Sequence, residues 1–206
     1  MTQKKLKEAL NFLQQIAAEG GVVLFVGTKP SAKMLIEKYA LEANCPYVSE
    51  RWLGGTLTNF SVIHQQVERY KKMLKEKEGN EWEKYTKKER LLLERELARL
   101  DKLLKGISNL DNLPSALYIV DIVDEITAVR EAKKKGIPVV AITDTNANPE
   151  YVSYPIPAND DAIKSVEMIT KLVAEAIKEG RNQSDKARIK KTEEGDSKDE
   201  EEQLKA

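Results

Sequence analysis

In "ALYIVDIVDEITAVREAKKKGIPVVAIT", residues 116–143, two apolar runs flank a charged segment. The runs at 116–121 and 138–143 lack the polar alternation of a half-exposed strand, which predicts strands covered on both faces. Between them, residues 125–135 predict a helix that Gly136 ends. A strand, a helix and a second strand in this order form the unit from which parallel sheets are built. The stretch therefore predicts a parallel sheet with helices packed on its faces.

The same alternation of strands and helices recurs on both sides of this stretch. We expect the α/β fold class, with a doubly wound, mostly parallel sheet in a three-layer, flavodoxin-like or Rossmann-like arrangement. Residues 1–60 and 107–180 together form this discontinuous domain. The further predicted elements are helices 3–19, 32–43 and 160–179 and strands 22–26, 46–48 and 151–156, with Ser31 and Asn159 as the caps of the second and third helix.

Residues 61–106 follow a different pattern, which predicts an inserted arm. Two apolar stripes with spacings of three and four, separated by a turn at 78–80, predict an antiparallel helical hairpin packed as a coiled coil. The arm carries 13 lysines and arginines against 9 acids, a net charge of +4. The stripes are Phe60, Ile63, Val67, Tyr70 and Leu74 in the first helix and Leu93, Leu97, Leu100 and Leu104 in the second.

The composition of the whole chain excludes several classes of protein. Its 206 residues contain 34 Lys and Arg and 34 Asp and Glu, so no attraction of the whole chain to a polyanion is expected. The single cysteine, Cys45, cannot form an intramolecular disulfide, which favours a reducing, cytoplasmic location. The apolar runs are far too short to span a membrane. We expect no membrane association and no stable homo-oligomer.

The end of the chain, residues 181–206, has almost no apolar content, which predicts a disordered tail. Residues 181–191 carry five cations and one acid, and residues 192–206 carry seven acids and two lysines. The two halves therefore have opposite net charges.

The turn "FVGTKPSAK", residues 25–33, lies where doubly wound folds bind phosphates. It does not match either glycine-rich phosphate-binding pattern, because Gly27 is its only glycine. A tight turn with exposed Lys29 and Lys33 is the preferred interpretation, and these lysines could bind a phosphate of a polymer. A nucleotide- or sugar-phosphate-binding enzyme is the minor alternative.

The stretch "RWLGGTLTNF", residues 51–60, contains no group for acid-base or nucleophilic catalysis. Arg51 can pair with a phosphate, and Trp52 either stacks on a base or wedges the arm against the sheet. Thr58 and Asn59 are expected to cap the first helix of the arm and to offer its N–H groups to a phosphate.

Carboxylates follow two strands of the predicted sheet, at the edge where an enzyme would place Mg²⁺ or paired acids. No partner nucleophile accompanies them, and Asp124 is equally placed to cap a helix. We therefore expect capping and turn roles, no catalytic residue, no cofactor and no metal. The carboxylates are Asp121, Asp124, Glu125 and Asp144.

Four segments together resemble landmarks of the bacterial-type small-subunit ribosomal protein S-two family, in the same order along the chain. They are residues 25–33, residues 51–60, "PSALYIVDIVDEITAVREAKKKGIPVVAITDTN" (114–146) and "IPANDDAI" (156–163), and the resemblance covers about residues 4–181. It implies a structural, non-enzymatic protein with a coiled-coil arm. Such a protein sits on small-subunit ribosomal RNA between head and body and helps to dock ribosomal protein S-one. Family members usually begin with a further segment containing a Phe-Gly-His landmark, so the contacts of that segment are not carried over.

The residues and the resemblance together predict a protein that binds ribosomal RNA through phosphate contacts, with neighbouring small-subunit proteins as further partners and no binding to DNA. A protein-interaction module that uses the helical hairpin is the other open alternative. The predicted RNA-binding residues are Lys29, Lys33, Arg51, Trp52, Thr58, Asn59, Arg69 and Lys72.

Overall fold

Five parallel strands form the centre of the computed structural model, which describes the backbone of residues 2–203 and the side chains of residues 2–184. The strands lie in the order β2-β1-β3-β4-β5, and all four pairings are parallel. This is the doubly wound order that reverses direction beside β1. The strands are β1 (Val23–Val26), β2 (Tyr47–Val48), β3 (Ala116–Val120), β4 (Val139–Thr143) and β5 (Tyr154–Pro157).

The central strands are buried on both faces, as their apolar runs predict. Every residue of β1, β3 and β4 is buried. The register pairs Val23 with Ala116 and Leu117 with Val139, so the strands of the quoted stretch lie side by side. The expected mostly parallel α/β sheet is therefore confirmed.

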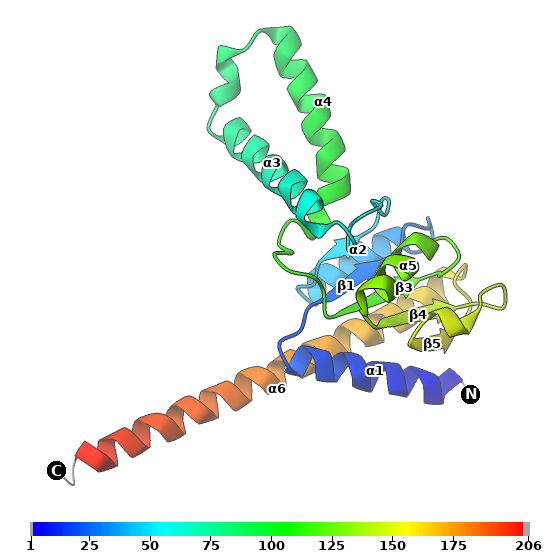
Figure 1. Ribbon diagram of the computed structural model, residues 1–206, viewed down its shortest axis with the longest axis vertical. Helices are drawn as coiled ribbons and strands as arrows, with labels where there is room; N and C mark the ends of the chain where they lie inside the picture. The colour runs from blue at the N-terminus through cyan, green and yellow to red at the C-terminus, as the bar shows by residue number, and fades with distance from the viewer. Residues whose placement is uncertain (1, 204–206) are drawn as a thin grey trace.

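Helices cover both faces of the sheet (Figure 1). On one face, α1, α2 and α6 bury their apolar residues against alternate residues of β1, β3 and β4. On the other face, α5 packs together with the base of the arm. The helices are α1 (Thr2–Ala18), α2 (Lys33–Glu42), α3 (Phe60–Glu78), α4 (Lys87–Leu104), α5 (Ile126–Lys135) and α6 (Ile163–Gln203), with short 3₁₀ turns η1 (Glu81–Lys84), η2 (Lys105–Ile107) and η3 (Pro149–Tyr151).

The arm consists of α3, which leads away from the sheet, and α4, which returns to it (Figure 1). Thr86 and Glu89 form a capping box at the start of α4, in which each side chain bonds the backbone N–H of the other residue. At the base, Ile63 and Leu104 are buried in the same core as α5. Farther out, the two helices line an open cavity of about 590 Å³. Coiled-coil packing along the full length of the arm stays a prediction.

Helix α6 differs from its predicted end near residue 179. The helix continues through Gly180. An added Cβ at this position would lie 2.2 Å from the Gln14 carbonyl oxygen, so the glycine is needed for the close approach of α6 to α1. Arg181, the first residue of the predicted disordered tail, donates hydrogen bonds to the carbonyl oxygens of Ala43 and Asn44. The backbone then stays helical to Gln203, and the Lys, Glu, Arg and Gln that predominate there are good helix formers. The expectation for residues 204–206 lies outside the described residues.

Two other predicted boundaries are wrong. The cap of α2 is Ala32, and the Ser31 hydroxyl donates instead to the carbonyl oxygen of Asp160. Strand β5 begins three residues later than predicted, because Asn148 accepts a hydrogen bond from the Glu150 N–H and holds a 3₁₀ turn first. A third boundary is also wrong, because α6 begins at Ile163 and not at residue 160. Asn159 therefore does not occupy its N-cap position, and its side chain accepts from the N–H groups of residues 161 and 162 in the turn before the helix.

Candidate nucleic-acid interface

The loop between β2 and α3 is folded around one buried carboxylate, Glu131 of α5. Its two oxygens accept five hydrogen bonds from this loop, at donor–acceptor distances of 2.7 to 3.2 Å. Glu131 itself is only 7% exposed. The donors are the Trp52 indole N–H, the backbone N–H groups of Gly55, Leu57 and Thr58, and the Thr58 hydroxyl.

The local sequence explains this arrangement. Gly55 has φ +94°, a left-handed backbone that glycine adopts without strain, and the resulting turn directs several N–H groups toward Glu131. Burial alone would raise the pKa of Glu131, but the hydrogen bonds from Gly55, Thr58, Leu57 and Trp52 together outweigh burial and lower it. The carboxylate therefore stays ionised and fixes the path of the chain into the arm.

This geometry decides between the two interpretations of Trp52. Its side chain is buried, and its N–H is bonded to Glu131 at 3.2 Å. The indole therefore wedges the loop against α5 and is not exposed for stacking on a base. Arg51 is exposed and makes no ion pair with any described residue.

The expected capping by Thr58 and Asn59 is wrong in its chemistry. Asn59 occupies the N-cap position of α3, but its side chain makes no capping hydrogen bond. Thr58 directs both its N–H and its hydroxyl to Glu131. This part of the helix start is occupied by an internal carboxylate, which leaves the Thr58 donors unavailable to an external phosphate.

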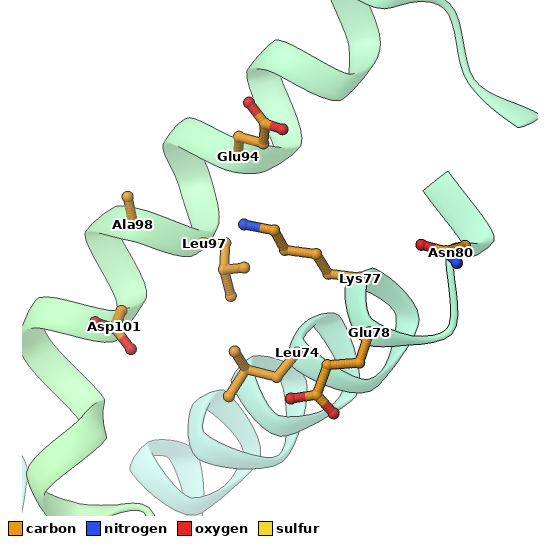
Figure 2. A pocket seen from close by; sticks show the side chains of 8 residues that line it. All are labelled: Leu74, Lys77, Glu78, Asn80, Glu94, Leu97, Ala98 and Asp101. Carbon is orange, nitrogen blue, oxygen red and sulfur yellow. The ribbon is translucent and has the colours of Figure 1, made fainter. Parts of the chain in front are cut away.

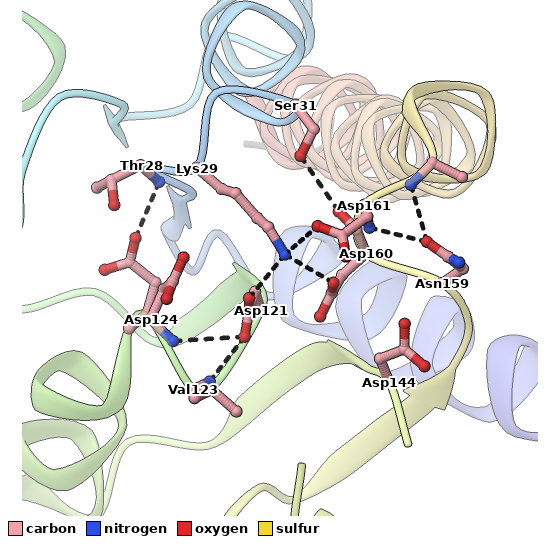
Figure 3. Close-up of polar contacts among 12 residues, drawn as sticks. Thr28, Lys29, Ser31, Asp121, Val123, Asp124, Asp144, Asn159, Asp160 and Asp161 are labelled. Carbon is pink, nitrogen blue, oxygen red and sulfur yellow. Dashed lines mark hydrogen bonds and ion pairs between the residues drawn. The ribbon is translucent and has the colours of Figure 1, made fainter. Parts of the chain in front are cut away.

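The second predicted site, the turn after β1, also holds an internal charge network (Figure 3). The Lys29 ammonium lies 3.1 Å from Asp121 and 2.9 Å from Asp160, and it also pairs with Asp161. Glu125 accepts a hydrogen bond of 2.8 Å from the Thr28 N–H. The carboxyl edge of the sheet is therefore filled by one lysine and the acids around it.

The electrostatics of this network keep Lys29 charged and engaged. Burial alone lowers the pKa of Lys29, but hydrogen bonds to Asp161, Asp160 and Asp121 raise it above its ordinary value. Asp121 has φ +68°, and its side chain accepts a hydrogen bond from the Val123 N–H, which stabilises the turn after β3. The expected exposure of Lys29 is therefore wrong, and the same acids would repel a nucleotide phosphate.

Of the carboxylates that suggested Mg²⁺, Asp121 and Asp144 have the turn roles that we preferred, but the expected capping role is not found. Asp121 makes the turn, and Glu125, not Asp124, is the N-cap of α5, without a capping hydrogen bond from its side chain. Among the described residues, no group of three or more His, Cys, Asp or Glu is placed to hold a metal ion. No helix within residues 2–203 is both long and apolar enough to cross a membrane.

Replacing Lys29 by methionine should lower the free energy of unfolding by about 3 kcal/mol, because three carboxylates lose their common partner. Urea denaturation measures this change. The control is Lys33→Met, since Lys33 forms a half-exposed pair with Glu50 and such pairs contribute roughly 0–1 kcal/mol. Equal effects of the two substitutions would contradict a structural role for Lys29.

Apart from Arg51, the other lysines and arginines that were predicted to contact RNA also form ion pairs. Lys33 lies 2.6 Å from Glu50, Arg69 2.7 Å from Glu96, and Lys72 3.8 Å from Glu76. Arg69 and Lys72 are nevertheless largely exposed, so their pairs are weak and can exchange for other anions. Their RNA contacts stay predictions.

The structure indicates other cations that sequence patterns alone did not single out. Five of the 13 lysines and arginines of the arm form ion pairs with described residues, and the rest do not. Two of these eight cations lie on α3 and six on α4, and the spacing of the six along α4 was the available signal. The eight remaining arm cations are Lys75, Lys77, Lys87, Lys88, Arg90, Arg95, Arg99 and Lys102.

The fold and these sites define a doubly wound α/β protein with an inserted cationic arm. In it, Glu131 of α5 accepts hydrogen bonds from the loop before the arm, and Lys29 pairs with acids at the carboxyl edge of the sheet. A family model described as Ribosomal protein S2 matches residues 1–180. The chain belongs to this family.

Curated relatives support the same assignment. The Small ribosomal subunit protein uS2 of Bifidobacterium longum is 52% identical over 177 residues, which are 85% of this chain and 63% of the relative. The proteins of the same name from Acidothermus cellulolyticus and Coprothermobacter proteolyticus are 48% and 47% identical, over 85% and 87% of this chain and 64% and 67% of their own lengths. This chain therefore spans about two thirds of the length of the relatives that it matches.

Proposed function

We propose that this protein is a structural, non-enzymatic component of the small ribosomal subunit in the cytoplasm and contributes to translation by binding ribosomal RNA. The relatives are named as proteins of that subunit. The observation that best supports RNA binding is a set of exposed cations on the arm that form no ion pair with a described residue. They stand out because the formal charge of the whole chain is zero. A-form RNA presents mainly phosphates and 2′-hydroxyls, so contacts by such cations recognise shape and charge.

The contacts that we propose differ from those expected from the sequence. Arg51 keeps its role, because it is exposed beside the loop that leads into the arm. Lys29, Trp52 and Thr58 act instead as internal supports. This also weighs against the enzyme alternative, since the turn that would hold a phosphate is occupied by carboxylates around Lys29.

Sedimentation of the tagged full chain in a cell lysate tests the ribosomal role. We expect it to co-migrate with small subunits at low salt and to be released as salt rises, because phosphate contacts weaken with salt. Arg51→Ala should lower the release concentration, while Lys29→Met should not change it as long as the protein stays folded. A chain that remains at the top of the gradient at every salt concentration would disprove the proposal.

Docking of a neighbouring ribosomal protein, such as S-one, is the second candidate function. It is favoured by exposed apolar side chains on the adjacent helices α2 and α6, where Met34 is 82% exposed and Met168 is 64% exposed. Binding of purified S-one without RNA, weakened by Met34→Gln with Met168→Gln, supports this role. Unchanged binding by that variant would exclude this surface.

A further inference from the structure

One face of α4 carries four cations and no acid. Lys88, Arg95, Arg99 and Lys102 are separated by seven, four and three residues, so at 3.6 residues per turn they lie within about 40° of a common line along the helix. All four are exposed, and none forms an ion pair with a described residue. The row runs along the helix for roughly 21 Å at 1.5 Å per residue.

The four acids of α4 lie away from this row, and three of them are bonded to other groups. Figure 2 shows Glu94 and Asp101 at the cavity between α3 and α4. The other two are bonded to neighbouring groups, so none of the four neutralises the row. The described contacts of these acids are Glu89 with Thr86, Glu96 with Arg69, and Asp101 with Tyr70.

Both ends of α4, the helix that carries the row, are fixed by contacts. The capping box of Thr86 and Glu89 fixes the first turn of α4. At the other end, Leu104 is 1% exposed within the core that also contains α5. Because both ends of α4 are fixed, binding a partner has to order the four side chains of the row but not the helix that carries them.

From this geometry we infer that the outward face of α4 binds the phosphate backbone of a double-stranded segment of ribosomal RNA. This inference rests on the proposed function and names the surface and the kind of RNA. A single strand is bound chiefly by stacking of bases on aromatic side chains. The row carries none. Near its outer end, Trp82 is buried, and Tyr85, which is 39% exposed, lies before α4 with the Lys84 ammonium over its ring. A duplex offers a regular line of phosphates to a straight line of charges.

The same face also exposes Leu91 at 47% and Leu92 at 56%, beside Lys88 and Arg95. Apolar side chains in this position are the feature that a protein partner would use. They add little to a phosphate contact, so substitution of the leucines separates the two kinds of partner.

The test compares two charge variants of the full chain that lose the same number of cations. The first replaces Lys88, Arg95, Arg99 and Lys102 with glutamine. The matched control replaces four cations that form ion pairs and are not among the predicted RNA contacts, and circular dichroism verifies that both variants fold. The control positions are Lys71, Lys84, Lys105 and Lys171.

Affinity for an RNA duplex of defined sequence, and for one of its strands alone, is measured against salt concentration. Each lost phosphate contact lowers the slope of log K against log salt by about 0.7–0.9, so the first variant should lose about three units on the duplex and the control less than one. Equal slopes for the first variant and the unmodified chain would overturn the inference, as would an equal loss in the control or tighter binding of the single strand.

The leucine variant Leu91→Gln with Leu92→Gln should keep duplex affinity within twofold. If it loses association with small subunits while its duplex affinity is unchanged, the face binds a protein and the inference fails. If the α4 charge variant co-sediments with small subunits as well as the unmodified chain does at every salt concentration, the inference fails and the proposed ribosomal role stands.

Discussion

Replacing Glu131 by alanine is expected to lower the free energy of unfolding by about 4 kcal/mol, because it removes a hydrogen-bonded buried charge and leaves five donors without their acceptor. For a chain of this size, the melting temperature should fall by about 8–16 °C. Thermal and urea unfolding measure both changes. Arg130→Ala is the control, since this exposed neighbour on α5 should change stability by less than about 0.5 kcal/mol. A loss below 1 kcal/mol for Glu131→Ala would contradict the role of this carboxylate.

The pH dependence of the same residue has a definite sign. Because the pKa of Glu131 is lowered in the folded chain, its ionised form stabilises the fold above the ordinary glutamate pKa of about 4.3, and this contribution is lost as the pH falls through the lowered value. The stability difference between the unmodified chain and Glu131→Gln should therefore shrink below about pH 4.3. A difference that stays constant down to acid unfolding would show that ionisation is unimportant.

Replacing Gly106 by alanine is expected to lower the free energy of unfolding by about 3 kcal/mol, or the melting temperature by about 6–12 °C. An added Cβ would lie 2.2 Å from the carbonyl oxygen of Tyr47 and 2.7 Å from its ring. The oxygen belongs to strand β2 and cannot move without disturbing the sheet. Gly106 therefore allows the return from the arm to touch the edge of the domain.

The matched control for this prediction is Gly54→Ala. An added Cβ at Gly54 meets no atom within 4 Å. We expect a change within about 0.5 kcal/mol. If the two alanine variants were equally stable in differential scanning calorimetry, the close approach at Gly106 would have no energetic consequence.

The elements of the sheet domain could be predicted because their signals are local. Buried strands such as 116–120 appear as uninterrupted apolar runs, and Gly136 ends α5 with φ +69°. The boundaries that failed depend on contacts that are distant in the sequence. Gly180 lies inside α6 because α6 packs closely against Gln14 of α1 at this position. Ser31 does not cap α2 because its hydroxyl donates to the carbonyl oxygen of Asp160, which is distant in the sequence.

The candidate site was harder to predict because charge is redistributed by tertiary pairing. Lys29 and Asp160 are 131 residues apart in the chain but 2.9 Å apart in the structure. Trp52 and Glu131 are 79 residues apart and form a hydrogen bond. No count of charges along a segment can reveal such neutralisation. The arm was more predictable, because its net charge of +4 is local and much of it stays on the surface.

Pairing between β1 and β3 joins Val23 to Ala116 across the whole inserted segment. During folding, the chain must close this long loop before the central strands can form hydrogen bonds, and the closure carries an entropic cost. Early formation of α3 and α4 would bring the ends of the insertion together and roughly halve the effective loop, which offsets about 0.6 kcal/mol of that cost. We therefore expect early formation of the projecting helices to speed assembly of the sheet by about threefold at most.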